Sequence, residues 1–187
     1  MFNRCFKIYG QALIQTKAAV LQVLARFKDS NNLPVFYAAL KSESYTVQAA
    51  ALFGISQLDE EKARQAARAF ENDNAGELTE AIFYLYGKNG DLKDWLYIYK
   101  RYTDGTLQEK IHLLAKFTTM IVNINNSAVT QQGIAVLTDM GIKYKADGAA
   151  SYIIKFLDQI KEAKKKQNDN ASVNEAVNGV NRINQAK

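Results

Sequence analysis

Apolar residues recur along this chain at the spacing of an α-helix. Val20, Val23, Leu24 and Phe27 stand at positions i, i+3, i+4 and i+7, which places them on one face of a helix. The same spacing returns in the segments 33–40, 47–58, 63–70, 78–85, 92–99, 107–118, 129–140 and 150–157. No segment shows a convincing strand pattern. The hydrophobic pattern therefore predicts about nine helices and an all-α fold.

Residues with the chemistry of helix caps precede most of these segments. An Asn, Asp or Thr at such a position can accept a hydrogen bond from the first free N–H groups of a helix. The single candidate caps are Thr16, Asn32 (with Pro34 in the first turn) and Asp147. The acids of Asp59-Glu60-Glu61 suit a helix start, and Asn89-Gly90-Asp91 precedes the segment 92–99. Two pairs have the spacing of a capping box, Asn74 with Glu77 and Thr106 with Glu109.

The predicted helices are joined by short loops and form pairs that repeat. Four similar helix starts, near Thr16, Thr46, Thr79 and Gln108, are roughly 30 residues apart, a period typical of helical-hairpin repeats. Each helix has one apolar stripe, so consecutive helices should pack as antiparallel pairs that stack on one another. We expect residues 15–165 to form an α-α superhelix, a HEAT-like solenoid. The competing interpretation is a helical bundle without repeats.

The two ends of the chain are harder to interpret. Residues 1–14 mix apolar side chains with Gly10 and are treated as a separate N-terminal segment, either a frayed helix or a former interdomain contact. Residues 166–187 read as a polar tail that contains a short terminal helix. Ser172 and Glu175 have the spacing of a capping box for that helix.

Positive charge is concentrated at the ends. The 187 residues carry a net charge of +5, yet residues 29–160 hold 13 basic and 16 acidic residues, a net charge of −3. A nucleic-acid-binding protein should carry a basic stripe across its folded body, so no nucleic-acid partner is expected. Lys164, Lys165 and Lys166 are interpreted as the solvated end of the last helix. No apolar run approaches the roughly 18 residues of a membrane span, and no membrane partner is expected.

Few residues offer catalytic or metal-binding chemistry. His112 is the only histidine and Cys5 the only cysteine, so neither a paired-imidazole zinc site nor a disulfide framework can form within the chain. No catalytic residue, metal ligand or cofactor is predicted. One aromatic and basic segment, with Tyr97, Lys100 and Arg101 turned away from Trp95, is a candidate interaction surface. The alternative is that these long side chains simply cover the core.

Several segments resemble a known family. Residues 44–52 (Ser-Tyr-Thr-Val-Gln-Ala-Ala-Ala-Leu), ending in Leu58-Asp59, are similar to the repeat signature of the C-terminal helical domain of the aminopeptidase N family of zinc metallopeptidases, particularly bacterial members. The further similar segments are residues 69–73, 80–82, 85–91 and 94–96. The resemblance covers about residues 12–165, and its motifs are moderately specific because Ala-rich hairpins also occur in unrelated scaffolds.

The resemblance implies a part of an enzyme rather than a whole one. Family members are hydrolases that hold zinc with a His-Glu-x-x-His helix and a downstream glutamate, beside a Gly-x-Met-Glu-Asn motif. With one histidine and neither motif, this sequence has no residue onto which those roles can be transferred. The expectation is a non-catalytic C-terminal domain that packs on a catalytic domain of the same polypeptide and walls the active-site chamber. Zinc is expected in that catalytic domain, peptide substrate is an indirect partner, and the parent enzyme is either cytoplasmic or exported.

Two other functions stay open at this point. A stand-alone HEAT-like scaffold would bind another protein, and its terminal helices should be polar on the outside. A domain taken from a larger enzyme should instead leave an apolar face where its catalytic domain packs. A basic nucleic-acid-binding protein ranks last because the body of the chain is acidic.

Overall fold

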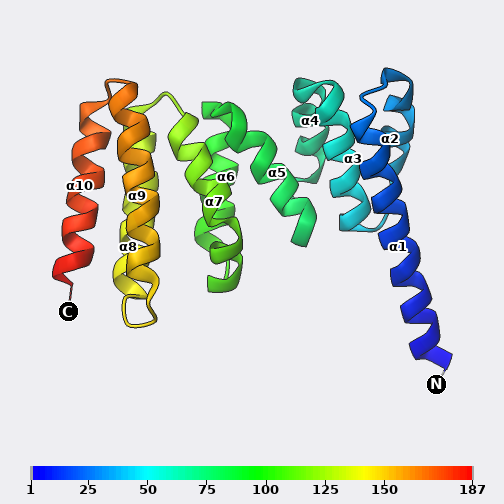
Figure 1. Cartoon of the computed structure of the whole chain (residues 1–187), viewed down its shortest axis with the longest axis horizontal. Coiled ribbons are helices and arrows are strands. Elements are labelled where there is room, and N and C mark those ends of the chain that lie inside the picture. The colour runs from blue at the N-terminus through cyan, green and yellow to red at the C-terminus, as the bar shows by residue number, and fades with distance from the viewer. Residues whose placement is uncertain (1, 187) are drawn as a thin grey trace. The chain divides into compact units, whose positions relative to one another are not determined.

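The fold is entirely helical in the part of the chain that the structure describes. The structure is a computed structural model that describes the backbone of residues 2–186 and the side chains of residues 11–186. Within residues 2–186 there are ten α-helices, α1 to α10, two short 3₁₀ helices and no strand (Figure 1). The predicted all-α class is confirmed. Nine helices match the nine apolar segments, and α10 is the terminal helix.

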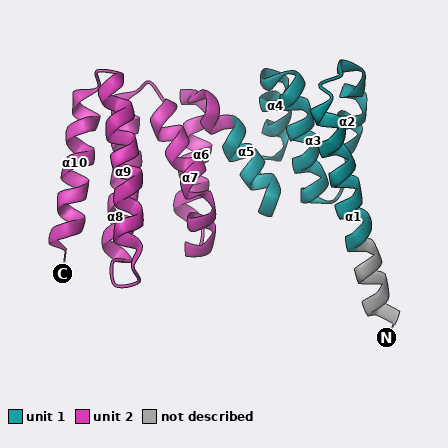
Figure 2. Cartoon of the chain, in the orientation of Figure 1, with its two compact units in different colours: residues 1–85 teal, residues 86–187 magenta. Residues whose placement is uncertain are grey.

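The chain divides into two compact units, residues 1–85 and residues 86–187 (Figure 2). The helices that begin in the first unit are α1 (Phe2–Arg26), α2 (Leu33–Ala39), α3 (Tyr45–Leu58), α4 (Glu60–Ala67) and α5 (Gly76–Asn89), with the 3₁₀ helices Ser30–Asn32 and Arg68–Phe70. The second unit has the end of α5, then α6 (Leu92–Asp104), α7 (Leu107–Asn123), α8 (Ser127–Lys143), α9 (Ala149–Lys166) and α10 (Asn170–Gln185).

Helix α3 is the centre of the first unit. It packs on α1, α2 and α4, and nearly all of its residues from Val47 to Ser56 are buried. Its small side chains allow close approach. Gly54 faces the ring of Phe36 on α2 so closely that even a Cβ atom would not fit there without a shift. The buried amide of Gln48 donates hydrogen bonds to the carbonyls of Leu40 and Ser42, which fixes the α2–α3 loop to the helix.

The core of the second unit is aromatic where α6, α7 and α8 meet. The rings of Tyr102 and Phe117 stack with centroids 3.9 Å apart, and Trp95 lies 5.8 Å from Phe117. Tyr102 Oη lies 3.5 Å from Met140 Sδ, and Trp95 Nε1 donates to Gln132 Oε1 at 3.3 Å. These contacts join the three helices through large buried rings, which contribute much apolar area per residue.

Helices two positions apart along the chain pack together within each unit. α1 contacts α3, α7 contacts α9, and α8 contacts α10. Stacked hairpins are expected to make such contacts, because each pair buries its stripe against the next pair. The packing is compatible with the predicted superhelix, which stays a prediction for the chain as a whole.

Several predicted helix starts are confirmed. α2 begins after Asn32 with Pro34 in its first turn, although the Asn32 side chain makes no capping hydrogen bond there. The Asp59 side chain accepts a hydrogen bond from Lys62 N at the start of α4. Asp91 accepts from Lys93 N before α6. The capping box of α7 is complete: Thr106 Oγ1 accepts from Glu109 N, and Glu109 Oε2 accepts from Thr106 N. Local sequence decided these positions because a cap needs only residues within one turn.

Other predicted caps are wrong. Thr16 lies inside α1, where its hydroxyl donates to Ala12 O at 2.8 Å, a bond that the helix interior tolerates. Asp147 does not cap α9, because Gly148, with φ of 81°, takes the N-cap position. At α10 the cap is Asp169, whose carboxylate accepts from Ser172 N.

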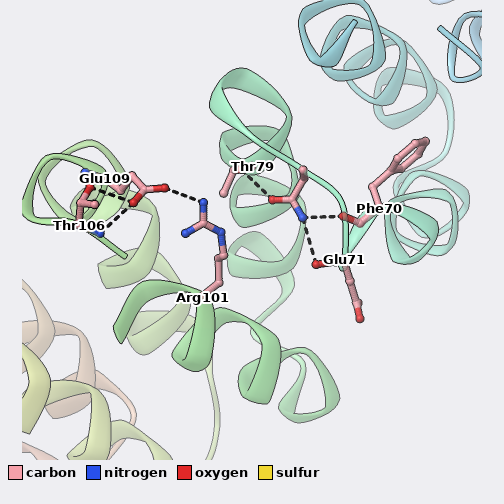
Figure 3. Close-up of polar contacts among 7 residues, drawn as sticks. Phe70, Glu71, Thr79, Arg101, Thr106 and Glu109 are labelled. Atoms are coloured by element: carbon pink, nitrogen blue, oxygen red, sulfur yellow. Dashed lines mark hydrogen bonds and ion pairs between the residues drawn. The ribbon is translucent and has the colours of Figure 1, made fainter. Parts of the chain in front are cut away.

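Asn74 holds a turn together. Its amide donates to the carbonyls of Phe70 and Glu71, and its oxygen accepts from the hydroxyl of Thr79 at 2.7 Å (Figure 3). The side chain therefore ties the end of the Arg68–Phe70 turn to α5. The predicted pairing with Glu77 is wrong, because α5 itself begins only at Gly76 and Glu77 lies in its first turn.

Residues 166–187 are more than a polar tail. α10 packs on both α8 and α9, and it buries Ala176, Gly179 and Ile183. Gly141 on α8 faces the side chain of Ile183, and Gly179 faces Thr138, so the two helices approach closely where neither has a side chain in the way. The Asn-rich segment therefore forms a helix whose apolar face is buried against α8 and α9.

Lys164 is buried, which corrects the interpretation of the Lys164–Lys166 run as a solvated end. The run closes α9, and Lys164 is only 1% exposed whereas Lys165 and Lys166 are exposed. Its ammonium group donates to Val122 O at 3.1 Å, Ile124 O at 2.6 Å and Gln167 Oε1 at 2.9 Å. Burial lowers the pKa of Lys164, and the Asp169 carboxylate opposes that shift. The lysine therefore satisfies carbonyls at the end of α7.

Replacing Lys164 should destabilise the protein. We expect Lys164→Met to lower the free energy of unfolding by about 3 kcal/mol, because the buried carbonyl of Ile124 loses its donor and that of Val122 keeps only Gln167 Nε2. Lys165→Met, on the exposed side of the same helix, is the matched control and should change it by less than about 0.5 kcal/mol. Urea unfolding followed by circular dichroism measures both. Equal effects of the two substitutions would contradict a special role of Lys164.

Candidate docking site

Helix α1 turns its large apolar side chains outward. Val20, Val23 and Phe27 are 53%, 51% and 71% exposed, although the sequence predicted them as the stripe that packs. The face buried against α3 consists of Ala18, Leu21 and Ala25. Two alanines on this face let the helix axes approach closely, which explains why the smaller stripe is the one buried.

An apolar groove lies between α1 and α2. Its volume is about 480 Å³, within the range of small-molecule and side-chain pockets. One wall is a stripe along α1 and the other is a stripe along α2, while Val47 at the start of α3 lies at the floor. The apolar residues of the two walls are Val20, Leu21 and Leu24 on α1, and Val35, Ala38 and Ala39 on α2. Leu21 and Val47 are buried, whereas Val20 and Val35 are about half exposed.

One end of the groove is polar and positively charged. Thr16, Lys17, Lys41 and Ser42 line it. Thr16 and Lys17 lie on α1 well before its end at Arg26, and Lys41 and Ser42 lie just after α2 ends, so all four share the end opposite the α1–α2 turn. Within the part of the chain whose side chains are described, neither lysine is paired with a carboxylate. Residues 1–28 contain five basic residues and no acidic one, so the sequence offers no counter-charge on α1.

The chemistry of the groove is that of a binding surface. Aliphatic side chains cover most of it, and two ammonium groups mark one end. Apolar surface that stays in contact with water gains free energy when a partner covers it, about 25 cal/mol per Å². The ammonium groups would then orient the partner through its charge.

The predicted surface of Tyr97, Lys100 and Arg101 is only partly free. Lys100 is exposed, whereas Tyr97 is half-buried with its ring edge-on to Tyr86 at 5.7 Å. Arg101 Nη2 donates to Glu109 Oε1 at 2.7 Å, and the same carboxylate completes the capping box with Thr106 (Figure 3). Arg101 is thus joined to the α6–α7 corner. The structure does not test a partner at this surface, and the docking interpretation of these three residues stays a prediction.

Among the described side chains, no residue with catalytic potential lines the groove. His112 is exposed on α7, and the side chain of Cys5 lies outside the described residues. Among the side chains that the structure describes, no three His, Cys, Asp or Glu residues come together as a group that could hold a metal ion. No described helix is both long and apolar enough to cross a bilayer.

The groove was missed by the sequence interpretation. Two signals in the sequence point toward it. One is the Val20, Val23 and Phe27 stripe, and the other is the absence of acidic residues before Asp29. Neither signal says whether another part of the same chain covers the stripe, which depends on tertiary packing.

The Glu109 carboxylate should make stability depend on acid pH. Arg101 first, and then Thr106, lower the pKa of Glu109 from 4.5 to about 2. The unfolded chain therefore takes up this proton at higher pH than the folded chain. Stability from this group is complete above pH 4.5 and is lost as the pH falls toward 2.

We expect Glu109→Gln to lower the free energy of unfolding by about 1 kcal/mol at pH 6, because the charged contact to Arg101 is lost while glutamine can still serve in the capping box. The difference from the unsubstituted protein should shrink by pH 3. Urea unfolding at both pH values measures it, with Glu43→Gln at an exposed loop position as control. A difference that is the same at both pH values would contradict the assignment.

Comparisons with known proteins gave no match. No family model fits the chain, and neither a curated protein nor a solved structure is significantly similar to it. Inferences about function are therefore based on the chain's own residues and on the packing of its helices.

Proposed function

We propose that this chain is a non-catalytic helical docking domain whose α1–α2 groove holds a helix of a partner protein domain. The observation that carries the proposal is the groove itself, in which Val20 and Val35 remain about half exposed. Contiguous apolar surface of this kind often marks a protein interaction site.

The packing of α1 supports this function. Its buried residues already hold it against α3, so the exposed stripe is not needed to attach α1 to the first unit. Full burial of a valine contributes about 1.5 kcal/mol or more. Covering the exposed halves of Val20 and Val35 should therefore contribute on the order of 1.5 kcal/mol to partner binding, about a tenfold change in affinity.

Photo-crosslinking in cells that produce the protein tests the docking function. A benzoyl-phenylalanine at position 20 should form a crosslink to a partner, and the same residue at position 177 on α10 should not. Val177 is the matched control because it is also an exposed valine, 42% exposed, and does not line the groove. The crosslink at position 20 should weaken when Val35 is replaced by serine. Equal crosslinking at both positions, or none at position 20, would refute docking at the groove.

A narrower candidate function is the C-terminal domain of a zinc aminopeptidase. Two observations favour it. The segments 44–52, 69–73 and 85–91 resemble the helical domain of that family. The exposed apolar residues of α1 also match the expectation for a domain that packs on a larger body, rather than a scaffold with polar terminal helices. In this role the chain would wall the active-site chamber, and the catalytic domain of the same polypeptide would be its partner and hold the zinc.

The enzyme assignment is tested separately from docking. The reading frame that encodes the parent polypeptide should contain a His-Glu-x-x-His segment upstream of this chain. The purified chain should show no hydrolysis of amino-acid anilides with added zinc, because no residue set for that reaction is predicted in it. A parent reading frame without that segment, or clear turnover by this chain alone, would refute the assignment to a zinc aminopeptidase and would leave the proposed docking function unaffected.

A further inference from the structure

We propose that the occupant of the groove is an amphipathic helix of a partner protein that carries acidic side chains at one end. This inference rests on the proposed docking function and adds the chemistry of the partner. It follows from the shape of the two groove walls and from the position of Lys17 and Lys41.

The shape of the groove fits a helix. The wall on α1 consists of Val20, Leu21 and Leu24, and that on α2 of Val35 and Ala38 with its neighbour Ala39, each at the spacing of one helix face. A third helix can lay its own apolar ridge between two such stripes, as in ridges-into-grooves packing. In helix-in-groove recognition, the bound helix contacts the groove through residues at positions i, i+3, i+4 and i+7. The occupant should therefore present aliphatic residues at that spacing.

The two lysines at one end of the groove favour acidic residues at one end of the bound helix. Lys17 and Lys41 line the end opposite the α1–α2 turn, and both are exposed. The rest of the lining away from that end is aliphatic, so a carboxylate elsewhere in the groove would be desolvated without a partner. Carboxylates placed over the two lysines would gain complementary charge and would fix the direction of the bound helix.

The same charges disfavour a second copy of this chain as the occupant. In a two-fold symmetric dimer the same surface patch is used on both copies, so the groove of each would face that of the other. The lining of the groove holds Lys17 and Lys41 and no acidic residue. Such an interface would therefore bring like charges together, which is unfavourable.

Designed helical peptides test the proposal on the full-length chain. Each fluorescent 18-residue peptide carries leucine at i, i+3, i+4 and i+7. Two peptides place a pair of glutamates in the first or the last turn, and each has a counterpart with lysines at those positions. Binding is measured by fluorescence anisotropy at low and at physiological salt, against the unsubstituted chain, the Lys17→Glu/Lys41→Glu variant and the Val20→Ser/Val35→Ser variant. Val177→Ser is the matched control, and circular dichroism checks that every variant is folded.

We expect at least one glutamate peptide to bind tenfold or more tightly than its lysine counterpart at low salt. The Lys17→Glu/Lys41→Glu variant should reverse this preference, and Val20→Ser/Val35→Ser should weaken binding about tenfold while Val177→Ser leaves it unchanged. Added salt should reduce the preference, because exposed charges are screened.

Three results would overturn the inference. If glutamate and lysine peptides bind equally, the acidic chemistry is wrong, and docking at the groove still stands provided that Val20→Ser/Val35→Ser weakens both. If no peptide binds, the helical occupant is wrong, and the crosslinking at position 20 decides separately on the docking function. If sedimentation shows a dimer that Val20→Ser/Val35→Ser dissociates, the occupant is a second copy.

Discussion

The close contact between α1 and α3 is the constraint on which the binding surface depends. α3 is buried along most of its length, and it accepts α1 through Ala18, Leu21 and Ala25. Two helices can approach this closely only where most of the side chains between them are small. Val20, Val23 and Phe27, on the other side of α1, are consequently turned to the outside. The groove follows from this arrangement, because α2 then stands beside an apolar face that α3 does not use.

In the second unit, polar side chains also join the helices. Lys164 brings its ammonium donors to acceptors near the end of α7 and the end of α9, which an apolar side chain could not satisfy. At the α6–α7 corner, Glu109 serves both the cap of α7 and Arg101. These residues would look like surface charges in a sequence. Their partners show that they stabilise the connections between helices.

The docking function and the narrower enzyme assignment share one physical basis. Both require that α1 meet a partner, since both interpret its exposed apolar side chains as one half of an interface. They differ in whether the partner belongs to the same polypeptide. In either case Lys17 and Lys41, which have no carboxylate partner among the described side chains, would give that interface a direction, because charge orients a partner more than it raises affinity.

The sequence by itself determined the helices, several of their starting positions and the all-α class. Helical periodicity and caps such as Asp91 and Thr106 depend on residues within one or two turns, so they can be read locally. Only the tertiary structure decided which face each helix buries. Val20 belongs to an apolar stripe that is exposed, whereas Lys164 is a charged residue that is buried. The reason is that burial depends on how closely two backbones can approach and on which distant carbonyls need a donor, and neither is encoded in the spacing along one helix.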